Sequence, residues 1–141
     1  MWHYNGQIID SVGKMPADVF GFVYKITNLV NGKVYIGKKQ VYSTTKRVFG
    51  KKEVEAMTDK RKAKHEYVTK ESNWLKYTGS NTILNAAVKN GDEVKREILV
   101  FCNSKSKLTY FETKYQFVEG VIEQDTYNDN INGKYFRKIF L

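Results

Sequence analysis

The apolar and polar positions of the chain predict three β-strands. Residues 20–27 and 33–37 are rich in aromatic and β-branched side chains and flank Asn31-Gly32, a combination typical of a β-hairpin. Residues 94–102, with the sequence VKREILVFC, predict a third strand. We therefore expect one small antiparallel sheet.

Two further segments have a helical pattern. Ser80 or Asn81 is placed to cap a short helix, ILNAAVK, that would end at Asn90-Gly91. Ser104 is a candidate cap for a longer helix of about five turns, whose apolar side chains recur at three- and four-residue steps: Leu108, Phe111, Tyr115, Val118 and Ile122. The predicted fold class is α/β (α+β), with a three-stranded antiparallel sheet flanked by helices.

Three segments are patterned more weakly. Residues 1–18 contain the breakers Gly13 and Pro16 and are expected to be a loosely structured lead-in. Residues 38–52 predict a short helix followed by a loop. Residues 53–72 are mostly charged and fit either an exposed helix or a mobile loop.

Composition limits the class of protein. The 141 residues fit one domain, and 41% hydrophobic residues exclude disorder of the whole chain. The single cysteine, Cys102, allows neither an internal disulfide nor a cysteine-based zinc site, which fits a reducing compartment. The sequence shows neither a signal-peptide pattern nor a long apolar run. We expect a cytoplasmic protein without a membrane partner.

The positive charge is concentrated in one segment. Of the net charge of +9, residues 38–70 carry +7, from eleven basic and four acidic side chains. A solvated lysine-rich face is one interpretation and a nucleic-acid surface is the other. The candidate DNA-binding residues are Lys38, Lys39, Lys46, Lys51, Lys52, Lys60, Arg61, Lys62 and Lys64.

Tyr24 and Tyr35 form a candidate polar site on the hairpin. In an antiparallel hairpin with an even-length loop, paired positions have an odd sum, so these two residues share a face. With a four-residue loop over 28–31 they would stand directly opposite each other. Cross-strand tyrosines also stabilise ordinary hairpins, so both interpretations remain open.

Glu112 lies at the edge of the apolar stripe of the longer helix, between Leu108 and Tyr115. A carboxylate beside a buried face needs a partner, because an unpaired buried charge is costly. It is either a rim residue that reaches solvent, or a metal ligand or active-site acid.

The segments VYKITN and KVYIG resemble the signature of the GIY-YIG nuclease family. Tyr35-Ile36-Gly37 is intact, whereas Phe22-Val23-Tyr24 replaces the first tripeptide and keeps its tyrosine. The resemblance covers roughly residues 20–130. The segment WLKYTGSN is similar to small stand-alone, homing-type phage nucleases of this family.

This resemblance implies a metal-dependent endonuclease that hydrolyses DNA phosphodiester bonds, in bacterial or phage-infected host cytosol. It implies a nuclease domain over 20–132 with a basic insertion at about 38–72, after a lead-in at 1–19 and before an extension at 133–141. The implied site consists of Tyr24 as general base, Tyr35 on the water or phosphate, Arg47 (or Lys46) on the phosphate, Glu112 holding Mg²⁺ or another divalent cation such as Mn²⁺, and Asn128 (or Asn130 or Asn132) fixing the last loop.

Other interpretations stay open at this stage. A basic nucleic-acid-binding protein on the same scaffold would not cleave and would need no metal. Trp74 and Tyr77 could stack on bases or belong to the core. A homodimer on DNA is one route to double-strand cleavage, and the biological role could be homing, restriction or DNA degradation.

Overall fold

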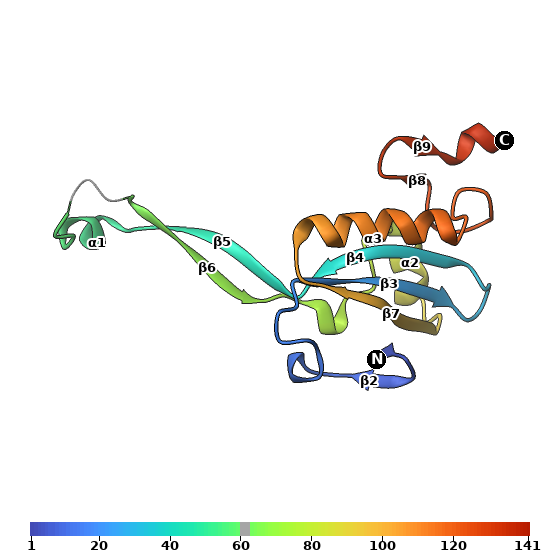
Figure 1. Ribbon diagram of the computed structural model, residues 1–141, viewed down its shortest axis with the longest axis horizontal. Coiled ribbons are helices and arrows are strands. Elements are labelled where there is room, and N and C mark those ends of the chain that lie inside the picture. Colours follow the sequence, from blue (N-terminus) through green and yellow to red (C-terminus); the bar gives the residue numbers. More distant parts are fainter. Residues whose placement is uncertain (60–62) are drawn as a thin grey trace.

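The computed structural model describes residues 1–59 and 63–141 and has an α/β body from which a long two-stranded arm projects (Figure 1). The body contains a five-stranded sheet in the order β2-β1-β7-β3-β4. Its strands are β1 (Trp2–Tyr4), β2 (Gln7–Ile9), β3 (Gly21–Asn28), β4 (Val34–Gln40) and β7 (Val94–Cys102). The arm consists of β5 (Tyr42–Val48), α1 (Lys51–Glu55) and β6 (His65–Glu71).

The remaining elements surround the sheet. The helices are α2 (Thr82–Lys89) and α3 (Lys105–Val118), and a small hairpin near the C-terminus is formed by β8 (Asn130–Ile131) and β9 (Tyr135–Phe136). Short 3₁₀ turns are η1 (Val12–Lys14), η2 (Trp74–Lys76) and η3 (Arg137–Phe140). None of the helices in the described part of the chain is long and apolar enough to span a membrane.

The predicted hairpin, third strand and two helices are confirmed. Asn81 caps α2, since its side chain accepts a hydrogen bond from the Leu84 amide at 2.9 Å. Ser104 caps α3 in the same way through the Lys107 amide. The longer helix ends at Val118 rather than near Ile122, because Gly120 adopts a φ of +57° just beyond it.

The hairpin register differs by two residues from the prediction. Tyr24 pairs with Gly37 and Tyr35 pairs with Ile26, so the tyrosines share a face as predicted but are not directly opposite. The turn occupies 29–32, because the Asn28 amide bonds the Lys33 carbonyl and Gly32 takes a φ of +74°. The two phenols are therefore diagonal neighbours across the strands.

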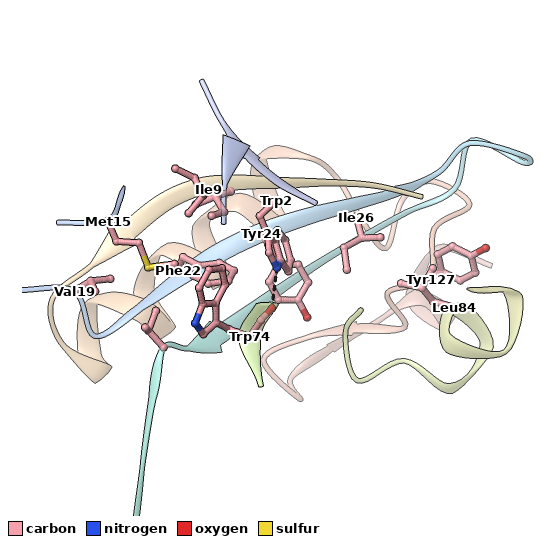
Figure 2. Packing of buried hydrophobic residues seen from close by; sticks show 12 residues of the cluster. Trp2, Ile9, Met15, Val19, Phe22, Tyr24, Ile26, Trp74, Leu84 and Tyr127 are labelled. Carbon is pink, nitrogen blue, oxygen red and sulfur yellow. Dashed lines mark hydrogen bonds between the residues drawn. The ribbon is translucent and has the colours of Figure 1, made fainter. Parts of the chain in front are cut away.

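The prediction of a loosely structured lead-in is wrong. β1 pairs in parallel with β7, and β2 extends the sheet beyond β1, so the sheet has five strands rather than three. Trp2 is fully buried, and its indole Nε1 donates a hydrogen bond to the Trp74 carbonyl at 2.8 Å (Figure 2). Contacts this distant in sequence carry no local signal.

Apolar residues cover both faces of the sheet. On one face, α3 packs over β3, β4 and β7 around Val23, Ile36 and Cys102. On the other, Phe22, Tyr24 and Ile26 of β3 pack with Trp2, Trp74, Leu84 and Tyr127 (Figure 2). Trp74 is thus a core residue, as one of the two interpretations predicted.

The predictions for the basic segment are wrong, because most of it forms the two paired strands of the arm. The predicted short helix is absent over residues 38–48: after the single residue Val41, β4 is followed by β5, and helix α1 begins only at Lys51 (Figure 1). Residues 65–71 are β6, paired with β5 along its whole length, and not a helix or loop. Both strands are rich in Thr, Val and Tyr, which favour a ribbon, whereas charged side chains conceal the alternation.

Candidate active site

A polar groove of about 370 Å³ lies at the edge of the sheet formed by β4. Tyr35 reaches it from β4 and Glu112 from α3. The other lining residues are Ser80, Asn81, Gln116, Tyr127, Asn128, Asp129, Asn130 and Asn132. The groove therefore joins a phenol and a carboxylate that are 77 positions apart in the sequence (112 − 35).

Tyr24 lies directly behind this groove and contacts two other phenols. Its ring centroid is 6.2 Å from that of Tyr35 and 6.0 Å from that of Tyr77. Its cross-strand partner is Gly37, where a Cβ atom would collide with the Tyr24 phenol. Gly37 is thus the residue that allows the Tyr24 ring to lie flat across β4.

The loop between η2 and α2 closes on the tyrosine pair. The hydroxyls of Tyr35 and Ser80 share a hydrogen bond of 3.0 Å. Gly79 has a φ of +91°, and a Cβ atom there would touch the Tyr35 ring at 3.2 Å and the Tyr24 hydroxyl at 3.4 Å. This close approach fixes the Tyr35 hydroxyl in the groove.

Both phenols are less acidic than free tyrosine. Burial raises the pKa of Tyr24, and the neighbouring Tyr77, Tyr35 and Glu112 add to the effect. Burial also raises the pKa of Tyr35, although its hydrogen bond with Ser80 acts in the opposite direction. Tyr24 is only 1% exposed, whereas Tyr35 is half-buried and lines the groove.

Glu112 projects from α3 with 20% of its side chain exposed. Its nearest cation is the Lys38 ammonium, 3.9 Å from Oε1, and the same ammonium donates to the Thr109 hydroxyl at 3.0 Å. Burial raises the pKa of the Glu112 carboxyl, and Lys38 partly offsets that effect. Lys38 therefore neutralises the Glu112 carboxylate only in part, which leaves negative charge for a second cation.

The donor set at Glu112 suits a hard divalent cation. Within residues 1–59 and 63–141, no group of three or more His, Cys, Asp or Glu side chains could form a protein-only metal cage. The groove instead offers the carboxylates of Glu112 and Asp129 together with hydroxyl and side-chain amide oxygens. Mg²⁺ accepts such a site, because it keeps several waters and often binds through one or two carboxylates. The residues thus fit the cation that the family implies.

Asn128 holds the rim of the groove against the free edge of β4. It is 5% exposed, and its side chain accepts from the Ile36 amide and donates to the Ile36 carbonyl, both at 2.9 Å. This side chain replaces a neighbouring strand at the residue between Tyr35 and Gly37. Arg137 secures the same loop by donating to the carbonyls of Val121, at 2.8 Å, and Asn128.

The structure does not bring Arg47 into the groove. Arg47 lies on β5 in the arm, where its Nε donates to Glu66 at 2.6 Å and its terminal nitrogens donate to Glu53 at 3.0 Å. The reason is that a strand, not an arginine-bearing helix, follows the hairpin. Lys46, the alternative to Arg47, lies on the same strand.

The candidate DNA-binding residues divide into two groups. Lys38 and Lys39 lie on β4 beside the groove, and the Lys39 ammonium sits 4.2 Å from the centroid of the Tyr77 ring. Lys46, Lys51, Lys52 and Lys64 belong to the arm and its tip. Lys60, Arg61 and Lys62 lie outside the described residues.

Several residues of this region were not assigned to the site from the sequence, among them Tyr77, Ser80, Gln116 and Arg137. Tyr77 and Ser80 lie in the segment WLKYTGSN, which the resemblance had already singled out. Gln116 follows Glu112 by one helical turn, and its amide donates to the Ile36 carbonyl at 3.1 Å. Nothing in the sequence around Arg137 indicated that it would contact this loop.

Comparison with protein-family models identifies the chain. The model described as "Putative endonuclease segE, GIY-YIG domain" matches residues 2–139. The chain therefore belongs to the GIY-YIG endonuclease family, and the resemblance seen in VYKITN and KVYIG is confirmed. Comparisons with curated proteins and with solved structures gave no significant match.

Proposed function

We propose that the chain is a metal-dependent DNA endonuclease whose active site is the groove at the edge of β4. The observation that carries this proposal is the meeting of Tyr35 and Glu112 in one polar groove, with Tyr24 behind them. The family membership supports a phosphodiester hydrolase, and the basic arm supports a polyanionic substrate.

Glu112 is the residue that would hold the cation, with amide oxygens of the groove nearby. A bound Mg²⁺ or Mn²⁺ supplies positive charge that stabilises the phosphoryl and leaving oxygens. Lys38, whose ammonium is 3.9 Å from Glu112, lines a neighbouring pocket together with Lys39. The two lysines are placed to attract the phosphate, the role that the resemblance had assigned to Arg47.

Tyr35 is better placed than Tyr24 to meet the attacking water. The Tyr35 hydroxyl lies in the groove and is hydrogen-bonded to the Ser80 hydroxyl, whereas Tyr24 is buried, with 1% of the residue exposed. Each phenol holds its proton at neutral pH, because burial raises both pKa values. Tyr35 can accept the water proton only as its phenolate, after its own proton has left for solvent, and positive charge near the hydroxyl favours that form. Tyr24 would position Tyr35 through ring contact.

The test is cleavage of supercoiled plasmid with Mg²⁺, with Mn²⁺ and with EDTA. Wild type should nick the plasmid only with metal, and Glu112→Gln and Tyr35→Phe should each lose at least about a hundredfold in rate, the usual weight of a general acid–base group. Glu93→Gln, which changes an exposed carboxylate outside the groove, is the matched control and should cleave normally.

Plasmid binding in EDTA, measured in parallel, separates the two candidate functions. Binding without cleavage under any metal condition would favour a non-catalytic nucleic-acid-binding protein on this scaffold. Cleavage that persists in Glu112→Gln would overturn the assignment of the metal site.

A further inference from the structure

The arm presents two chemically different faces. Residues paired across an antiparallel ribbon share a face, and successive pairs alternate between faces. One face, which we call the open face, holds the pairs Tyr42–Glu71, Thr44–Thr69, Lys46–Tyr67 and Val48–His65. The pairs Ser43–Lys70, Thr45–Val68 and Arg47–Glu66 lie on the other, the braced face.

Arg47 ties the tip helix to the braced face. Its guanidinium bonds Glu66 on the neighbouring strand and, through two parallel hydrogen bonds, Glu53 on α1. Helix α1 therefore leans toward the outer half of this face. The outer half of the open face is left uncovered, and Tyr67 is 67% exposed there.

The same ion pairs leave the lysines of the arm available. Glu53 and Glu66 are both occupied by Arg47, and Glu71 accepts a hydrogen bond from the Trp74 indole. Among the described residues, Lys46 and Lys70 form no ion pair. The open face thus carries one free ammonium, the two exposed phenols of Tyr42 and Tyr67, a half-buried imidazole and two threonine hydroxyls within a single ribbon. These groups are hydrogen-bond donors to phosphates and base edges.

We propose that the open face of the arm binds in the major groove of duplex DNA, next to the bond that is cut. This inference rests on the proposed function, which it deepens by naming the surface that selects where the enzyme acts. A two-stranded ribbon fits a major groove about 12 Å wide. The major groove of DNA is favoured over the phosphate backbone alone, because the open face combines one cation with neutral hydrogen-bond donors.

The root of the arm fixes its distance from the active site. Only Val41 separates β4 from β5, and Ser72 donates to the carbonyls of Val41 at 2.8 Å and Gln40 at 2.6 Å. At roughly 3.3 Å per residue, the chain extends about 16 Å from Lys39 to Thr44 and about 30 Å from Lys39 to Val48. Along B-DNA these lengths correspond to about 5 and 9 base pairs.

The first measurement is binding to a labelled duplex of about 30 base pairs in EDTA, over a series of salt concentrations. Lys46→Gln should weaken binding roughly tenfold and lower the salt slope by about 0.9, the value for one lost phosphate contact. Lys70→Gln makes the same charge change on the braced face and should leave both unchanged. Tyr67→Ala on the open face should likewise weaken binding, and Val68→Ala on the braced face is its matched control and should not.

Equal losses in Lys46→Gln and Lys70→Gln would overturn the choice of face, because only the net charge would matter. No loss in either variant would overturn the arm as a DNA-binding surface. Thermal unfolding of each variant checks the fold, which these exposed positions should not disturb.

The second measurement is cleavage of a duplex library randomised on both sides of a fixed cut. Wild type should select bases on one side only, roughly 5–9 base pairs away, and Lys46→Gln with Tyr67→Ala should abolish that selection. Selection that survives in the double variant would contradict the proposal. Face-dependent binding without any cleavage would leave the arm as the DNA surface and reject only the proposed catalytic function.

Discussion

At the scale of single residues, Gly37 shows why the tripeptide Tyr-Ile-Gly ends in glycine in this chain. A methyl group there would collide with the Tyr24 phenol and press on Tyr35 at 3.0 Å. Gly37→Ala should cost about 1–3 kcal/mol of unfolding free energy, as overpacking does, and displace both phenols. Urea unfolding and plasmid cleavage measure the two effects. Gly50→Ala, at an open position, should change neither.

Asn128 belongs to the same scale, because one side chain satisfies both polar groups of Ile36 at the sheet edge. Asn128→Ala leaves the buried Ile36 amide without an acceptor, whereas the Ile36 carbonyl keeps its hydrogen bond from Gln116, so the variant should lower the free energy of unfolding by about 1–3 kcal/mol. Asn90→Ala, an exposed asparagine, serves as control. Wild-type stability in the Asn128 variant would contradict this, and would show that water or the neighbouring Gln116 satisfies the Ile36 amide.

Burial of Glu112 and the tyrosines sets the pH dependence. Burial raises the pKa of Glu112, and only the ionised carboxylate binds a cation. The Mg²⁺ concentration for half-maximal cleavage should therefore rise as the pH falls through that raised value. At saturating Mg²⁺ the rate should increase with pH, because burial also raises the pKa of Tyr35 and its phenolate forms only in base. Initial rates over a pH and Mg²⁺ grid measure both trends.

At the scale of elements, Arg47 is a brace between strand and helix. If it acts through Glu53 and Glu66, then Arg47→Met and the double change Glu53→Gln with Glu66→Gln should disorder the tip of the arm to the same extent. Hydrogen exchange of the β5 and β6 amides measures this order. A cleavage defect in Arg47→Met alone, with normal exchange, would instead place the guanidinium on the phosphate.

The elements predicted from sequence are those stabilised locally. The hairpin, β7, α2 and α3 have period-two or helical patterns and caps at Asn81 and Ser104, all within short windows. β1 escaped notice because its three residues depend on Trp2 reaching Trp74 across the fold. The arm was missed because its side chains face solvent on both sides, which removes the apolar alternation.

The candidate site was partly predictable for a similar reason. Tyr24, Tyr35 and Glu112 follow from motif and helical position, and the structure brings them to one edge of the sheet. Arg47 was assigned by its place after the hairpin, but the chain continues there as a ribbon that carries it away from the groove. Lys39 and Tyr77 meet only through the folding of η2 onto β4.

At the scale of the whole molecule, Trp2 connects the N-terminal strands to the site. Its ring packs against Phe22 and Tyr24 (Figure 2). The Arg96 guanidinium lies 4.8 Å from the centroid of the same ring. Trp2→Ala should destabilise the fold by about 3–5 kcal/mol and reduce cleavage, because it removes the support of Tyr24. Ile8→Ala, an exposed position of β2, should have little effect. Thermal unfolding with plasmid cleavage tests both.

The closed root of the arm has an evolutionary consequence. Because Val41 and Ser72 are hydrogen-bonded to each other, the chain enters and leaves the arm at almost one point. Everything between them can be shortened, lengthened or exchanged for another ribbon without moving β4, α3 or the groove. If the arm selects the target as proposed, target choice and bond cleavage are separable in this chain, and new specificities can arise by grafting at two peptide bonds while the body is inherited unchanged.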